Sequence, residues 1–173
     1  MSNENEDLTS DTTVEQRALS MLHEAFAAAR AGDATALLRL LTRGVPANVR
    51  TEKGDGLLML ATYHGHEAAA RVLLEHGADP ALANDRGQTP LGGVAFKGDV
   101  ACARLLLDHG ARVDTPMADG KTPATLAAMF DHVAILELLR ERGANFAEQT
   151  APLELARAMG ATRAVAWLEA RTA

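Results

Sequence analysis

The chain repeats a pattern of glycines at a constant spacing of about 33 residues, and a fixed period in this range is the mark of repeat architectures. Two series of glycines keep the spacing: Gly54, Gly87 and Gly120, and then Gly44, Gly77, Gly110 and Gly143. Between the glycines, each unit holds a turn, an apolar stretch, Gly-His or a variant of it, a leucine-rich stretch and Gly-Ala. Each unit is therefore expected to form one small assembly of helices or strands.

The three central units share the pattern at many equivalent positions along their length. The second contains Gly54, Gly65-His66, Val72-Leu73-Leu74 and Gly77-Ala78. The third contains Gly87, Thr89-Pro90-Leu91, Gly98-Asp99, Leu105-Leu106-Leu107 and Gly110-Ala111. The fourth contains Gly120, Thr122-Pro123-Ala124, Asp131-His132, Leu138-Leu139 and Gly143-Ala144. Threonine before proline is a good helix entry, and the later glycines follow apolar stretches where a helix closes with a left-handed residue.

These motifs closely resemble the ankyrin repeat over about residues 18 to 170. The resemblance implies a mainly α solenoid of about five stacked helix-turn-helix repeats with β-hairpin-like fingers and atypical capping repeats at both ends. The corresponding ranges are 14–47, 48–81, 82–114, 115–147 and 148–173. One repeat cannot bury its apolar face alone, so neighbouring repeats must stack to form a shared core.

The two ends of the chain depart from the pattern. Residues 1–13 are acidic and are expected to form a disordered tail, followed by a single repeat domain over 14–173. We expect a long helix to begin near Val14, with Thr12 and Glu15 as a capping box. In the last repeat Pro152 follows Pro123 at less than one full period, so part of the finger is missing. Trp167 occupies the column of Val72, Leu105 and Leu138 and is predicted to be an apolar lid on the stack.

Composition and charge exclude several classes of protein. Five acidic residues precede the first basic one, and the rest of the chain is nearly neutral, which argues against a nucleic-acid-binding face. No apolar run is long enough to span a bilayer, and the polar start is the reverse of a signal peptide. A cytoplasmic protein without membrane association is expected. The excess of arginine over lysine and the alanine content indicate a GC-rich bacterial source.

No constellation for catalysis is visible. Gly120-Lys121-Thr122 resembles the end of a phosphate-binding loop, but Thr115 stands where that motif needs glycine. Serine occurs only as Ser2, Ser10 and Ser20, none of them in the three central repeats, so no serine nucleophile is expected in the body of the fold. An enzyme with a site near Gly92-Gly93 is a disfavoured alternative. We therefore expect no enzymatic activity and no catalytic residues.

Metal and cofactor sites are also unsupported by the sequence. His64 and His66 flank a glycine at a turn and lack the spacing of three or four that places two ligands on one helical face. His66 and His132 share a repeat position and are predicted to bridge helices, while His76 and His109 precede helix-ending glycines. Cys102 aligns with apolar positions and is predicted to be a buried core residue. No cofactor or metal is expected.

The resemblance points to two columns of residues on a concave face. The two residues before Gly-His lie there in ankyrin-like proteins, and the finger tips line its edge. The first column contains Arg30, Tyr63, Phe96, Met129 and Ala158; the second contains Ala31, His64, Lys97, Phe130 and Met159. Three of the six aromatic residues in the chain fall in these columns. Either they form an apolar partner site, or they fold down and pack between repeats.

The finger tips complete the candidate site with polar groups of both signs. Lys53, Asp85, Arg86 and Lys121 are predicted to form a polar rim around the apolar residues, although ordinary solvated turns have the same composition. The sequence thus predicts a non-catalytic module that binds a protein partner as an adaptor, regulator or inhibitor of immunity type. The alternative is a structural protein that associates with itself. A monomer is expected, with a homodimer as the alternative.

Overall fold

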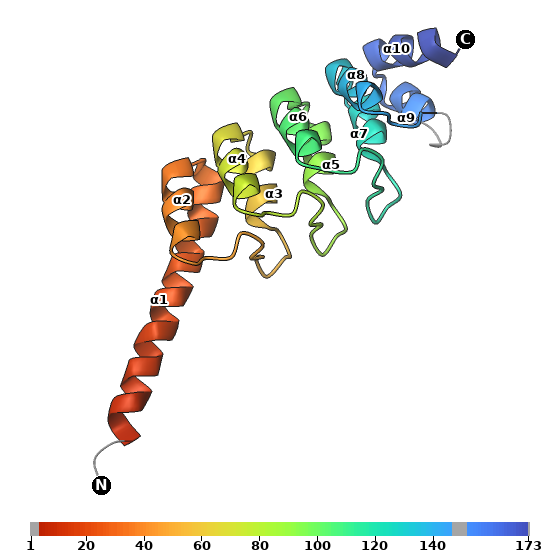
Figure 1. Ribbon diagram of the computed structural model, residues 1–173. Helices are drawn as coiled ribbons and strands as arrows, with labels where there is room; N and C mark the ends of the chain where they lie inside the picture. The colour runs from red at the N-terminus through yellow and green to blue at the C-terminus, as the bar shows by residue number, and fades with distance from the viewer. Residues whose placement is uncertain (1–3, 147–151, 173) are drawn as a thin grey trace.

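The described residues of the computed structural model, 4–146 and 152–172, form ten helices that pair and stack along one axis (Figure 1). The first four are α1 (Glu4–Ala31), α2 (Ala34–Thr42), α3 (Leu57–Tyr63) and α4 (Glu67–Glu75). The next four are α5 (Pro90–Lys97), α6 (Val100–Asp108), α7 (Pro123–Met129) and α8 (Val133–Glu141). The last two are α9 (Pro152–Met159) and α10 (Thr162–Thr172). The prediction of a mainly α repeat solenoid with five helix pairs is confirmed.

The helices form two layers with the core between them. In the inner layer α1, α3, α5, α7 and α9 pack one against the next, and the outer layer runs from α2 through α4, α6 and α8 to α10. In Figure 1 the fingers project beside the inner helices. The largest side chains that are fully buried come from both layers: Leu37, Leu40, Leu57, Leu73, Leu91, Leu106, Ile135, Leu136, Leu138 and Leu139. The leucine-rich stretches therefore supply the core that joins neighbouring repeats.

Short polar side chains cap several of the described helices, and the two threonine entries are those that the sequence predicts. The Thr89 hydroxyl accepts a hydrogen bond from the Gly92 N–H at 3.1 Å, and Pro90 opens α5. Thr122 caps α7 in the same way, so the Gly-Lys-Thr tripeptide serves as a helix start. Asp33 and Asp99 cap the outer helices α2 and α6. Each cap satisfies an N–H group that has no partner within its own helix.

The predicted fingers are tight hairpin-like turns. A backbone hydrogen bond closes each one: Thr51 N–H to Asp55 C=O at 2.9 Å, Asn84 to Gln88 at 2.9 Å, and Met117 to Lys121 at 2.8 Å.

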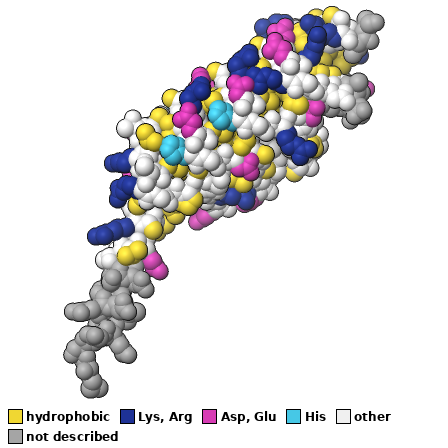
Figure 2. All heavy atoms as spheres, viewed as in Figure 1, with side chains coloured by type: hydrophobic (Ala, Val, Ile, Leu, Met, Phe, Trp, Pro, Cys, Tyr) yellow, Lys and Arg dark blue, Asp and Glu magenta, His cyan; other side chains and the backbone are white. Residues whose placement is uncertain are grey.

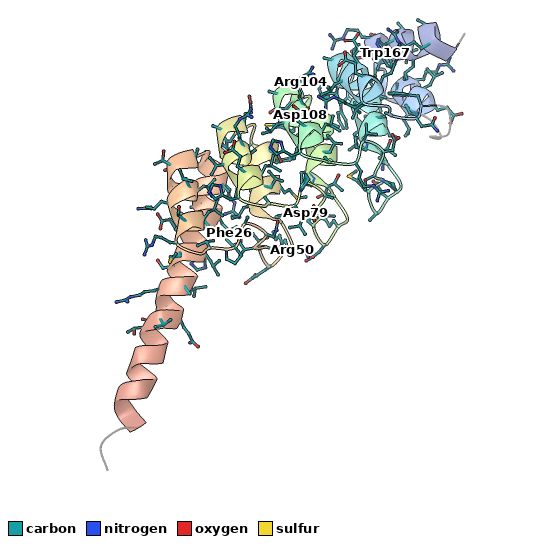
Figure 3. All side chains as sticks on the ribbon, in the orientation of Figure 1. Phe26, Arg50, Asp79, Arg104, Asp108 and Trp167 are labelled. Atoms are coloured by element: carbon teal, nitrogen blue, oxygen red, sulfur yellow. The ribbon has the colours of Figure 1, made fainter. Side chains whose placement is uncertain are left out.

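The first two of these fingers are also joined to each other. The Arg50 guanidinium forms an ion pair with Asp85 at 2.8 Å and donates to the Ala83 carbonyl at 3.0 Å. Figure 3 shows Arg50 on the finger side of the stack. The sequence analysis did not identify this arginine, whose partner lies 35 positions away.

Two histidines join consecutive repeats, as predicted. The His66 ring Nε2 lies 2.9 Å from the Arg30 carbonyl oxygen, and the His132 Nε2 lies 3.0 Å from that of Phe96. Each ring thereby satisfies a carbonyl at the end of an inner helix in the preceding repeat. The outer helices add an ion pair between Arg142 and Asp108, which is labelled in Figure 3, at 2.7 Å.

The junction between the fourth and fifth repeats depends on Asp131. This residue has a φ of 60° where the other repeats have glycine. Its carboxylate accepts hydrogen bonds from Arg163 Nε at 2.9 Å and from the Ala164 N–H at 2.7 Å. Burial acts to raise the pKa of Asp131, but these bonds outweigh it and hold the pKa below its usual range. Asp131 thus combines a left-handed backbone conformation, which is uncommon for residues other than glycine, with side-chain hydrogen bonds to the next repeat.

The N-terminal helix corrects one prediction. α1 begins at Glu4 rather than near Val14, so residues 4–13 are helical in the structure and not a disordered tail, and Thr12 lies within the helix instead of capping it. The segment from Glu4 to Ala31 contains neither glycine nor proline, the two residues that most often end a helix. Residues 1–3 lie outside the described part. Figure 1 shows α1 extending well beyond the first helix pair.

Trp167 closes the opposite end of the stack. Its side chain is buried at 8% exposure, and its ring centroid lies 5.6 Å from that of Phe146. The Arg171 guanidinium stacks 4.2 Å from the centroid of the indole ring. Figure 3 shows Trp167 at the far end of the stack from α1. The predicted burial of this residue is confirmed.

A pair of substitutions separates the inter-repeat contact of His132 from backbone strain. Gly98 and Gly110 have φ of 76° and 92°. An alanine Cβ at 98 would lie 2.6 Å from His132 Nδ1, whereas one at 110 would meet nothing within 4 Å. We expect Gly110→Ala to lower the free energy of unfolding by about 1–2 kcal/mol. Gly98→Ala should cost about 1 kcal/mol more, because His132 must leave the Phe96 carbonyl. Urea unfolding followed by circular dichroism measures both, and equal losses would contradict the role given to His132.

Candidate functional site

Large apolar side chains are exposed in line along the inner layer. Tyr63, Phe96, Phe130 and Met159 are 43%, 38%, 37% and 53% exposed, and they come from the ends of α3, α5, α7 and α9. We call these four residues the apolar column. Contiguous apolar surface of this kind on a protein often marks a binding site.

Two members of the apolar column are in ring contact while remaining exposed. The Phe96 and Phe130 rings meet edge to face with centroids 4.5 Å apart. The Lys97 ammonium lies 5.4 Å from the Tyr63 ring centroid, and the His64 ring lies 5.8 Å from it. Met129 differs, since it is half-buried. The Phe96 and Phe130 rings therefore pack on each other across two repeats, and all three aromatic rings of the column also keep exposed surface.

The predicted rim residues divide into free and engaged groups. Lys53 and Arg86 are exposed at the tips of their fingers. Asp85, in contrast, pairs with Arg50 of the preceding finger, and Lys121 pairs with Asp119 of its own finger at 2.6 Å. The hydrogen bond from Lys121 lowers the pKa of Asp119 from its usual value. Asp85 and Lys121 therefore have roles within the fold.

A pocket of about 200 Å³ opens in the inner layer beside the apolar column. Its lining comes from the second, third and fourth repeats: Met59, Tyr63, Gln88, Thr89, Gly92, Gly93, Phe96, Met117 and Leu126. We call it the glycine notch, because Gly92 and Gly93 take the place of side chains in one wall. The tyrosine and phenylalanine of the column form part of the same lining, so the notch and the column are one continuous surface.

The repeat register explains why the notch exists. Gly93 stands one repeat period from both Leu60 and Leu126, so the third repeat lacks a leucine that its two neighbours have. Gly92 likewise aligns with Met59 and Thr125. The sequence analysis considered this glycine pair only as the place of a disfavoured enzymatic site. Comparison of equivalent positions in the three central repeats was the signal that could have identified the pocket.

Other candidate chemistry has structural explanations. His76 and His109 cap α4 and α6, and each ring bonds a carbonyl of its own helix, at 2.8 Å and 2.9 Å. Cys102 is fully buried, and burial raises the pKa of its thiol to about 12. Among residues 4–146 and 152–172, no group of three His, Cys, Asp or Glu side chains could hold a metal ion.

Charges of both signs are interspersed over the surface. Figure 2 shows acidic and basic side chains mixed along the visible face of the stack. This distribution agrees with the nearly neutral composition beyond the N-terminal segment. None of the helices in the described part of the chain is long and apolar enough to cross a membrane.

Comparisons with known proteins agree on the repeat. The family model for ankyrin repeats matches residues 25–117, 73–150 and 95–170. A protein of Pseudomonas aeruginosa whose name describes it as an ankyrin repeat protein is 49% identical over 51 residues. That alignment spans only 30% of this chain and 30% of the relative.

The glycine notch predicts an unusual response to alanine. An added Cβ at Gly93 would lie 3.6 Å from Tyr63 Cδ2, an ordinary contact, and alanine favours a helix over glycine. Gly93→Ala should therefore raise the free energy of unfolding by about 0.5–1 kcal/mol. At Gly92 the added Cβ would lie 3.0 Å from Met117 Sδ, a tight contact. Gly92→Ala should therefore raise the free energy of unfolding by less than Gly93→Ala does. Urea unfolding of both variants checks the difference, and a destabilised Gly93→Ala would show that the wall is already full.

The environment of Cys102 predicts an unreactive thiol. A thiol with a pKa of about 12 stays protonated near pH 8, and the thiolate is the reactive form. The folded protein should therefore react with a disulfide reagent such as Ellman's reagent only at the rate of unfolding. After denaturant is added, the single thiol of each chain should react rapidly, giving one equivalent of released chromophore. Immediate labelling of the native protein would contradict the buried position.

Proposed function

This chain belongs to the ankyrin repeat family, and on that premise we propose that it binds a protein partner through its inner layer and finger tips without catalysing a reaction. Ankyrin repeats are generally protein–protein interaction modules, and the family is generally non-catalytic. The role proposed here is that of an adaptor, a regulator or an inhibitor of immunity type. The proposed setting is the cytoplasm of a bacterium, and the Pseudomonas relative supports the bacterial source.

The exposure of the apolar column is the observation that carries this proposal. Exposed apolar side chains cost solvation free energy unless something covers them. Four of them stand in line on successive inner helices, where the stacking of repeats places them side by side. Aromatic residues and methionine are enriched at the centres of protein interfaces.

Cationic side chains border this surface and support a polar rim. Lys97 covers one side of the Tyr63 ring, while Lys53 and Arg86 extend from the fingers into solvent. Rim charges of this kind contribute to the rate and specificity of association more than to its strength. We assign partner affinity to the apolar column and partner choice to these three residues.

An affinity capture from the source cells tests the proposal. The bait variant Tyr63→Ala/Phe96→Ala/Phe130→Ala removes three rings of the column. The matched control is Leu38→Ala, which removes a side chain of similar exposure, 45%, from the outer helix α2. A partner identified by mass spectrometry should be captured by the wild type and by Leu38→Ala but lost by the triple variant. Single replacements of Tyr63 or Phe96 should weaken its binding by about 1–2 kcal/mol or more.

The outcomes separate this proposal from self-association. A partner retained by the folded triple variant would place binding on another surface. If the column instead pairs two copies of the chain, light scattering should give a molar mass that rises with concentration above 18.3 kDa and returns to that value in the triple variant.

A further inference from the structure

We infer that the glycine notch holds one large apolar side chain of the bound partner, a leucine, methionine or phenylalanine that stands close to a carboxylate on the same segment. The inference rests on the proposed function, which it deepens by stating the chemistry of the partner. It assigns a distinct task to a part of the inner layer that the repeat pattern alone does not require.

The notch has the size of a site for one side chain. Its volume of about 200 Å³ is smaller than the range of about 300–1,000 Å³ that is usual for small-molecule pockets. It arises in the column where Leu60 and Leu126 supply leucine and Gly93 supplies none. The missing volume inside the protein is thus that of one apolar side chain, which a partner can provide.

The backbone does not need glycine at position 93. The residue lies within α5, and its added Cβ would make only an ordinary contact, 3.6 Å from Tyr63 Cδ2. Glycine in a helix interior disfavours folding relative to alanine. Neither the path of the chain nor a close neighbour therefore accounts for the absence of a side chain here, whereas a space that admits a partner group does.

The lining of the notch selects an apolar occupant. Met59, Met117 and Leu126 present sulfur and hydrocarbon, and the rings of Tyr63 and Phe96 border the opening. Methionine side chains are flexible and polarizable, so they adjust to apolar groups of different shape. The lining also contains Gln88 and Thr89, but their oxygens already accept hydrogen bonds from Asn84 and from the Gly92 N–H. A buried hydrogen-bonding or charged group of the partner would therefore lose its water and find few partners.

The charges nearest the notch favour an acidic neighbour in the partner. The Lys97 ammonium lies over the Tyr63 ring, and no ion pair is formed by it within residues 4–146 and 152–172. The carboxylates of Asp85 and Asp119 on the adjoining fingers are already paired with Arg50 and Lys121.

The fingers themselves carry equal numbers of opposite charges: Arg50, Lys53, Arg86 and Lys121 against Glu52, Asp55, Asp85 and Asp119. The charge that remains beside the notch is therefore that of Lys97, and a carboxylate next to the apolar anchor complements it.

A selection from random peptides tests the inference without knowledge of the partner. Phage displaying random 12-residue peptides are selected on the immobilised full chain, and enriched peptides are synthesised and titrated by fluorescence polarisation. We expect them to share a leucine, methionine or phenylalanine with aspartate or glutamate within about three positions. Replacement of that apolar residue by alanine should weaken binding about tenfold or more.

Three variants of the protein locate the bound side chain. Gly93→Leu introduces the leucine that the neighbouring repeats have at this position, and it should weaken peptide binding about tenfold or more. The matched control is Ala101→Leu, which adds the same bulk at an exposed position of the outer helix α6 and should leave affinity unchanged. Lys97→Gln should weaken binding about threefold and reduce its dependence on salt. Thermal unfolding establishes that each variant is folded.

Methyl NMR supplies a readout that does not depend on a variant. Peptide binding should shift the methyl resonances of Met59 and Met117, which line the notch. The methyl group of Met21 in α1, outside the lining, should not move.

Each remaining outcome overturns the inference in a recognisable way. Peptides that bind Gly93→Leu normally but not the triple variant of the apolar column would leave the proposed function standing and the notch unused. Peptides that bind both Gly93→Leu and the triple variant normally would contradict the inference and the proposed function together. Selection of no peptide, or of peptides without an apolar residue, would contradict the inference that an apolar side chain of the partner fills the notch. The affinity capture tests the proposed function separately. A dimer abolished by Gly93→Leu would assign the notch to a second copy. Shifts of the Met59 and Met117 methyls with hexanoate alone would assign it to a small apolar acid.

Discussion

The structure depends on the inability of one helix pair to bury its own apolar face. Leu73, Leu106 and Leu139 occupy the same position in successive repeats, and each is fully buried only because another repeat lies against it. Stacking at a constant period follows from this constraint. It also brings the ends of successive inner helices side by side. Tyr63 and Phe96 occupy one repeat position, and Phe130 and Met159 occupy the next, so the exposed apolar column follows from the same stacking that forms the core.

The polar contacts between repeats vary where the apolar ones do not. His66 and His132 reach back to carbonyls of the preceding repeat, whereas Asp99, at the equivalent position, caps its own helix. The junction between the second and third repeats is instead joined through its fingers by Arg50 and Asp85. Its inner helices lack a histidine bridge, and Tyr63 and Gly93 face each other there. The glycine notch thus lies where fingers rather than helix ends supply the polar contact.

The register made most of the fold predictable from sequence, because its period is long and is kept at many positions of each repeat. It also placed Tyr63, Phe96 and Phe130 on one surface. It could not give the extent of α1, where the acidic charge of the segment suggested solvation and the absence of glycine and proline was the better guide. It shows that a leucine is missing at Gly93, but it could not give the full lining of the notch, which includes Met117 from a finger, because a position in a repeat does not state which side chain of another repeat reaches it.

Internal repeats provide their own reference for separating folding from binding. At a position where folding alone decides, all repeats should converge on similar residues, as they do at the buried leucines. Gly93 departs from Leu60 and Leu126 without a backbone reason, and Phe96 is a large apolar residue although it is exposed. Both features work against stability, one through helix propensity and the other through solvation. They line the same pocket. Two unfavourable residues that share a surface are better explained by an external partner than by the needs of the stack.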